Sequence, residues 1–130
     1  NYIDTAYPYH NGKSEPFVGK ALKKYDRSSL YLATKLPVWL VNSVEDAKRL
    51  FEEQCEHLQT DYIDLGMIHY VDSEEEWEMI QHSDYLDYVM ELKNSGVIRH
   101  IGMSSHNPKV AVKAAESGYV EMILFSINKI

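Results

Sequence analysis

The stretch Leu30-Tyr-Leu-Ala-Thr-Lys35 is a short apolar run that ends in a charged residue. Two other runs have the same form: Tyr2-Ile3-Asp4 ends in an aspartate and Leu65-Gly-Met-Ile-His69 ends in a histidine, while Tyr9 follows in the loop after the first run. The carboxyl ends of neighbouring parallel strands meet at one edge of a sheet, where ligands and catalytic groups lie in parallel α/β folds. If the runs are such strands, the sequence predicts a single site made of Asp4, Tyr9, Lys35 and His69.

The composition is typical of one globular domain with a small-molecule partner. The chain has 130 residues, and 20 acidic against 13 basic side chains give a net charge of −7. This charge opposes nonspecific binding to nucleic acid and to anionic membranes, so we expect neither as a partner. The single cysteine, Cys55, cannot form an internal disulfide, and no run has the length and apolarity of a membrane span or signal peptide. We therefore expect a cytoplasmic protein.

Amphipathic stretches separate the apolar runs and indicate repeated βα units. Ser14-Glu15-Pro16 begins the first predicted helix, because proline is tolerated in a first turn. The buried stripe of this helix is expected to consist of Phe17, Val18, Ala21 and Leu22. Ser43 is the expected N-cap of a second helix, in which helical spacing places Cys55 on the buried face.

Two more helices follow the same rules. One is predicted at about residues 85 to 94 and stops at Gly96. The other is predicted at residues 108 to 117, with Asn107-Pro108 as its cap and first helical residue. The acidic run Asp72-Ser-Glu-Glu-Glu76 is expected to be a solvated loop or the start of a helix.

Residues 63 to 70, 98 to 104 and 121 to 128 have the composition of largely buried parallel strands. The predicted order is therefore β-α-β-α-β-α-β-α-β. Right-handed crossovers would allow either an open doubly wound sheet or part of a (β/α)8 barrel, and spacing alone does not choose between them. A full barrel typically needs about 250 residues. Because the chain begins within a predicted strand and ends without a following helix, we expect both ends to cut through a repeat.

Several motifs together resemble the aldo-keto reductase family. They are Asn1-Tyr-Ile-Asp-Thr-Ala6, Tyr9, Lys13-Ser-Glu15, Ala33-Thr-Lys35, Asp61-Tyr-Ile-Asp64 leading to Ile68-His69, and Ile101-Gly-Met-Ser104. The resemblance covers essentially the whole chain and implies an α/β fold, a partial (β/α)8 TIM barrel with approximately strands two to six. Residues 1–130 would then be the central portion of a single barrel domain, truncated at both ends.

The sequence of residues 7–15 and 35–39 is similar to that of a bacterial branch of this family. Members of that branch often carry a carboxy-terminal ferredoxin-like module. Iron-sulfur clusters are therefore expected only in such a module, and residues 1–130 do not include one.

The resemblance also implies an oxidoreductase that reduces a small aldehyde or ketone with NADPH or NADH, NADPH being the expected cofactor. The hydride leaves an alkoxide that needs a proton, and Tyr9 would donate it. A nearby ammonium favours phenolate, so Lys35 would tune Tyr9. Asp4 would compensate the buried charge of Lys35 and help to bind the cofactor. His69 would donate a hydrogen bond that orients the carbonyl.

Two serines are the other implied cofactor contacts. Ser104 would bind the nicotinamide carboxamide, and Ser105, which stands where many members have asparagine, would make the second contact. Leu124 stands where many relatives have glutamine. Trp39 and Trp77 each follow a strand that ends in a residue of the site, and we expect them to line a substrate pocket or, equally, to pack the barrel rim.

Some alternatives stay open. The other histidines have no close pair with metal-ligand spacing, so no metal site is expected. The fold could also serve as a catalytically weak nicotinamide-binding regulatory barrel, or the chain could be an inactive barrel fragment, because unpaired strand edges invite aggregation. The natural substrate, the direction of the reaction and the oligomeric state do not follow from the sequence.

Overall fold

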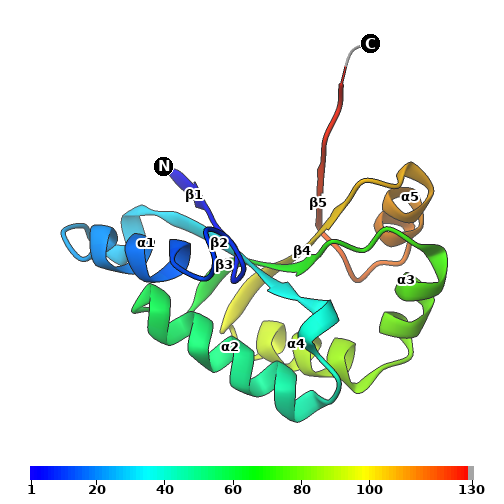
Figure 1. Ribbon diagram of the computed structural model, residues 1–130, viewed down its shortest axis with the longest axis horizontal. Helices are drawn as coiled ribbons and strands as arrows, with labels where there is room; N and C mark the ends of the chain where they lie inside the picture. Colours follow the sequence, from blue (N-terminus) through cyan, green and yellow to red (C-terminus); the bar gives the residue numbers. More distant parts are fainter. Residues whose placement is uncertain (129–130) are drawn as a thin grey trace.

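Five strands form one curved, fully parallel sheet. The computed structural model describes residues 1–128, with β1 (Tyr2–Asp4), β2 (Tyr31–Pro37), β3 (Ile63–His69), β4 (Ile98–Ser105) and β5 (Met122–Phe125). The strands pair in the order β1-β2-β3-β4-β5, and every neighbouring pair is parallel. A doubly wound sheet reverses its strand order at a switch point, whereas this order runs in one direction. The sheet is therefore part of a (β/α)8 barrel, and its helices lie along one side (Figure 1).

The helices are α1 (Ser14–Leu22), α2 (Val44–Leu58), α3 (Glu74–Gln81), α4 (Asp84–Asn94) and α5 (Pro108–Glu116). Two short 3-10 turns, η1 (Arg27–Ser29) and η2 (Val38–Leu40), lie on either side of β2. Among the described residues none of these helices is long and apolar enough to cross a membrane.

Helix α3 is an addition to the four helices that the sequence predicts. The Ser73 hydroxyl accepts the N–H of Glu76, and the Glu76 carboxylate accepts the N–H of Ser73. This reciprocal capping box satisfies two free amides, and acidic side chains in the first turn suit the positive end of the helix dipole. The acidic run is thus a helix start, and Trp77 lies inside α3 rather than in a loop.

The predicted caps of α2 and α5 are confirmed. The Ser43 hydroxyl accepts the N–H of Asp46 at the start of α2. The Asn107 side chain accepts the N–H of Lys109 at 3.0 Å, and Pro108 is the first residue of α5. Gly96, the predicted stop of the third helix, lies two residues after the end of α4. Its φ is +81°, a conformation that glycine adopts without steric cost.

The predicted buried stripe of α1 is only partly correct, because Val18 and Leu22 pack half-buried against the core whereas Phe17 and Ala21 are exposed. Phe17 is 73 % exposed, and the buried residues of this helix are Glu15 and Gly19. A Cβ atom on Gly19 would lie 2.1 Å from the carbonyl oxygen of His57, so α1 touches the end of α2 at backbone distance. The buried residues of α1 are therefore a glycine and the carboxylate-bearing Glu15. Cys55 is partly buried against the core, and burial raises the pKa of its thiol to about 11.

Burial follows the position of each strand in the sheet. β3 and β4 have neighbours on both sides and are largely buried, whereas β5 has only β4 beside it among the described residues. β5 is shorter than predicted, and its residues are exposed or half-buried. The parallel strand predicted in residues 121 to 128 is therefore present, but the expectation that it is largely buried is wrong.

Candidate active site

The strand register places three of the predicted site residues on one face of the sheet. Asp4 pairs with Ala33, two residues before Lys35, and Lys35 pairs with Met67, two residues before His69. Side chains two positions apart point to the same face of a strand. Asp4, Lys35 and His69 therefore share a face, and each lies at or near the carboxyl end of its strand.

Lys35 is the centre of this group. Its side chain is fully buried, and its ammonium donates to Asp4 Oδ1 at 2.5 Å and to the carbonyl oxygen of Thr5 at 3.0 Å. The same ammonium lies 4.8 Å from the centre of the Tyr9 ring. A buried ammonium is costly unless it is paired and hydrogen-bonded, so Asp4 and Thr5 stabilise the charge of Lys35. The same positive charge acts electrostatically on the nearby Tyr9 ring.

Tyr9 reaches the group from the loop between β1 and α1. His10, Asn11 and Gly12 all have positive φ values of 53°, 55° and 78°, so the backbone turns in a left-handed conformation directly after Tyr9. Non-glycine residues rarely adopt this conformation, and residues with strained backbones cluster at functional sites. The Tyr9 side chain is 38 % exposed, which keeps its ring accessible to a ligand.

His69 faces Tyr9 from β3. The two rings meet edge to face with centroids 5.8 Å apart, and His69 Nδ1 is buried without a hydrogen-bond partner. Burial of the ring, followed by the nearby charge of Lys35, lowers the pKa of His69 to about 4. The imidazole is therefore neutral at pH 7, and a neutral imidazole has one N–H donor and one acceptor.

Ser104 has the free donor that a bound amide oxygen requires. Its hydroxyl is buried and accepts the N–H of Tyr70 at 2.8 Å, and this is the hydroxyl's one hydrogen bond among the described residues. The pairing of β3 with β4 aligns Met67 with Gly102, so Ser104 lies on the same face as His69. Ser104 therefore fits the carboxamide contact that the sequence predicts.

The Ser105 hydroxyl, unlike that of Ser104, already has several partners within the protein. The hydroxyl lies 3.2 Å from Asp72 Oδ1 and 3.3 Å from the carbonyl oxygen of Asn107, and it accepts the N–H of Asn107. The hydroxyl proton is thus used within the loops after β3 and β4. In the structure Ser105 joins these two loops, and its contact with the carboxamide stays a prediction.

Asp72 is the acceptor that holds the two loops together. It accepts the N–H of His106 at 2.6 Å and lies 3.2 Å from His106 Nδ1. Burial raises the pKa of Asp72, but the hydrogen bonds from His106 and Ser105 outweigh it, so the pKa lies below its usual range.

The two tryptophans have different environments. Trp39 lies in η2, is exposed, and packs its ring 5.2 Å from that of His69. Trp77 is 2 % exposed and belongs to the core, because α3 turns it inward. Trp39 therefore lies where a substrate pocket was expected, whereas the burial of Trp77 favours the packing alternative. Leu124 pairs with Ser104 and presents an aliphatic side chain beside it.

The sequence did not reveal Tyr70 as part of the site. It directly follows His69, has a left-handed φ of 63°, and packs its ring 6.3 Å from Trp39 and 4.9 Å from His106. Its position one residue after a strand-end histidine was the available signal. Nothing in the sequence indicates the strained backbone that turns this ring toward Trp39.

Comparison with protein families gives one consistent result. The model of the aldo/keto reductase family matches residues 1–128. Aldo-keto reductase YhdN of Bacillus subtilis is 38 % identical over 111 residues, which cover 79 % of this chain and 32 % of the relative. Methylglyoxal reductase DkgB of Escherichia coli O157:H7 is 32 % identical over 115 residues, which cover 86 % of this chain and 40 % of the relative.

Solved structures agree with this result. Aldo-keto reductase AKR11C1 from Bacillus halodurans, in its holo form, has a TM-score of 0.79 and 33 % identity, with 98 % of this chain and 44 % of that chain covered. An aldo-keto reductase from Klebsiella pneumoniae in complex with NADPH has a TM-score of 0.73 and 25 % identity, with 95 % and 42 % covered. The chain thus spans less than half the length of each of these proteins.

Proposed function

The chain belongs to the aldo-keto reductase family, and from this premise we propose that it is the central portion of one barrel domain that reduces an aldehyde or ketone to an alcohol with NADPH or NADH. By the complete barrel we mean this chain joined to the remaining strands of a (β/α)8 fold. The observation that carries the proposal is the contact of the buried Lys35 ammonium with both Asp4 and the Tyr9 ring.

The residues divide the chemistry among themselves. Bound nicotinamide supplies the hydride, and the protein supplies position, a proton and charge stabilisation. Tyr9 donates the proton to the carbonyl oxygen, and the Lys35 ammonium beside its ring stabilises the phenolate that remains. Neutral His69 donates one hydrogen bond to the carbonyl oxygen, which orients the substrate and shares its developing charge.

The remaining residues hold these groups in place. Asp4 fixes the direction of the Lys35 ammonium through Oδ1. The Tyr2 hydroxyl donates to Oδ2 of the same carboxylate at 3.1 Å. The Ser104 hydroxyl would donate a hydrogen bond to the nicotinamide carboxamide, while Trp39 would form one wall of the substrate pocket. NADPH is favoured over NADH on family grounds alone.

The test replaces Tyr9 with Phe in the complete barrel. We expect the turnover number to fall by about 10²- to 10⁴-fold, the range for loss of a general acid, while NADPH fluorescence titration gives an unchanged dissociation constant. Tyr31→Phe is the matched control, because Tyr31 is exposed at the other end of β2. Unchanged turnover in Tyr9→Phe would refute the proposed role.

A regulatory barrel without useful turnover is the second candidate. The engaged hydroxyl of Ser105 and the aliphatic Leu124 favour it, because both replace polar cofactor contacts of many relatives. Binding of NADPH by the complete barrel, with no reduction in a broad panel of carbonyl compounds, would support this candidate. Reduction of any of them would exclude it. Binding of NADPH by the complete barrel but not by residues 1–130 would identify the isolated chain as an inactive fragment.

A further inference from the structure

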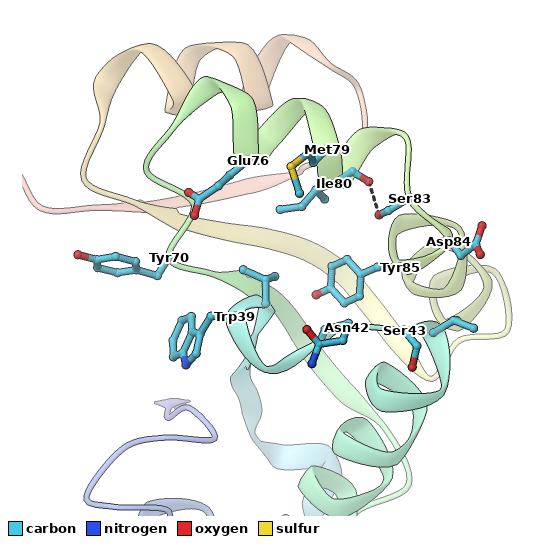
Figure 2. A pocket seen from close by; sticks show the side chains of 13 residues that line it. Trp39, Asn42, Ser43, Tyr70, Glu76, Met79, Ile80, Ser83, Asp84 and Tyr85 are labelled. Atoms are coloured by element: carbon cyan, nitrogen blue, oxygen red, sulfur yellow. Dashed lines mark hydrogen bonds between the residues drawn. The ribbon is translucent and has the colours of Figure 1, made fainter.

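A second hollow lies next to the candidate active site. It is a cleft of about 720 Å³ between η2, the start of α2, and the helices α3 and α4 (Figure 2). We call it the outer cleft. Its apolar walls consist of Val38, Val41, Val44, Met79 and Ile80. A hollow of this size lies in the range of small-molecule sites, which extends from about 300 to 1,000 Å³.

Two aromatic residues lie between the outer cleft and the candidate active site. Trp39 and Tyr70 both line the cleft, and Trp39 also packs its ring 5.2 Å from that of His69. The rings of Trp39 and Tyr70 lie 6.3 Å apart and meet edge to face. A molecule whose reacting group lies beside His69 therefore reaches the cleft by extending along these two rings.

The polar groups of the cleft restrict what it can bind. Tyr85 is buried, its side chain points into the cleft in Figure 2, and burial raises the pKa of its phenol, which is therefore uncharged. Glu76 and Asp84 are the charged residues of the lining, and no cation lines the cleft within the described part of the chain. An anionic group would be repelled here and would have no counter-charge.

We propose that the outer cleft binds the uncharged apolar tail of the carbonyl substrate, so that the preferred substrates are long-chain or arylalkyl aldehydes and ketones without a carboxylate or phosphate. The inference rests on the proposed reductase function for the reacting end of the substrate. Burial of each methylene group in an apolar cleft increases affinity about three- to fourfold. The tail contributes this increase only once it is long enough to pass Trp39.

The test measures kcat/KM of the complete barrel for unbranched aldehydes from propanal to dodecanal. We expect a rise of about three- to fourfold per methylene over the middle of the series, followed by a plateau. Met79→Trp fills the cleft from a side chain that is 72 % exposed, so the core packing stays intact. This variant should flatten the rise and leave the value for propanal unchanged.

The matched control is Phe17→Trp, because Phe17 is equally exposed but lies on α1, away from the cleft. We expect this variant to keep the full dependence on chain length. A flat series in the unmodified protein, or equal behaviour of the two variants, would overturn the proposal.

Calorimetric titration separates this proposal from the reductase proposal. Decan-1-ol should bind the complete barrel, bind Met79→Trp about tenfold more weakly, and bind at least tenfold more tightly than 10-hydroxydecanoate, because the carboxylate at the far end of that tail would meet Glu76 and Asp84. If decan-1-ol binds in this way but no aldehyde is reduced, the cleft stands and the reductase proposal fails. If aldehydes are reduced but decan-1-ol does not bind, or Met79→Trp binds it equally well, the cleft proposal fails alone.

Discussion

Two polar clusters lie on opposite faces of β2, and they are built in opposite ways. Thr34 and Lys35 are neighbours in the strand, so their side chains point to different faces. Lys35 belongs to the inner cluster with Asp4, Tyr9 and His69. Thr34 belongs to an outer cluster, in which it meets residues of α1 and α2.

The outer cluster is closed. The fully buried carboxylate of Glu15 accepts from the Thr34 hydroxyl at 2.6 Å and from the Gln54 amide at 2.8 Å, and its second oxygen lies 3.2 Å from His57 Nδ1. Gln54 also donates to the carbonyl oxygen of Lys35 at 3.0 Å. Each buried polar group has a partner inside the protein, as a structural cluster requires.

The inner cluster is left open. His69 Nδ1 is the one buried side-chain polar atom without a partner among the described residues, and the Tyr9 side chain stays partly exposed. A buried group without a partner costs free energy, and such costs concentrate at functional sites. The satisfied cluster therefore holds α1 and α2 against β2, whereas the unsatisfied one is available to a ligand.

Replacement of Lys35 by Met should give the largest effect and would break the inner cluster. The phenolate of Tyr9 loses its nearby cation, so we expect kcat of the complete barrel to fall by about 10²- to 10⁴-fold, or about 3 to 5 kcal/mol of transition-state stabilisation. Steady-state kinetics with a saturating aldehyde measures this loss. A fall of less than tenfold, with cofactor binding retained, would mean that Lys35 is a structural residue like those of the outer cluster.

The protonation of His69 should make the stability of the protein depend on pH. The pKa of His69 is about 4 in the folded protein and about 6.5 in a free chain, so the unfolded state binds the proton first as the pH falls. Stability should therefore be constant above pH 6.5 and fall by about 3 kcal/mol between pH 6.5 and pH 4. Urea unfolding at several pH values measures this loss, with His69→Asn as the control that lacks it. An NMR titration midpoint near 6.5 would show that water reaches the ring freely.

Glu15→Leu breaks the outer cluster. Thr34 and Gln54 lose their shared acceptor in a buried place, so we expect a loss of about 2 to 3 kcal/mol in the free energy of unfolding. The catalytic rate per folded molecule should stay the same, because Glu15 in α1 packs against the face of β2 that points away from the inner cluster. Glu15→Gln keeps the acceptor and should cost less. A lower kcat with unchanged stability would instead place Glu15 in the catalytic machinery.

Much of the fold follows from local rules in the sequence. The alternation of apolar runs and amphipathic stretches predicts the strands, and the caps at Ser43 and Asn107 predict where two helices begin. The choice between a barrel and a doubly wound sheet needed the strand order, because both folds share the same local pattern. The exposure of Phe17 was missed because α1 contacts α2 through the backbone at Gly19, a contact that hydrophobic spacing does not record.

The site follows from the sequence only in part. The strand-end positions of Asp4, Lys35 and His69 predict that these residues meet, and the structure brings them together. The environments of Ser105 and Trp77 depend on other segments, which local sequence does not reveal. The Ser105 hydroxyl donates to Asp72, which lies 33 residues away in the sequence. A capping box makes the acidic run the start of a helix, and this helix buries Trp77.

His57→Ala should give the smallest effect and tests how closed the outer cluster is. His57 contacts the second oxygen of Glu15 and packs its ring 6.2 Å from that of Tyr7, but its side chain is 34 % exposed. Water can replace it, so we expect a loss of about 1 kcal/mol or less in the free energy of unfolding, measured by the urea midpoint. A loss as large as that of Glu15→Leu would mean that His57 seals the carboxylate from water. The outer cluster would then depend on all four of its side chains, whereas a small loss leaves Thr34 and Gln54 as the pair that holds Glu15.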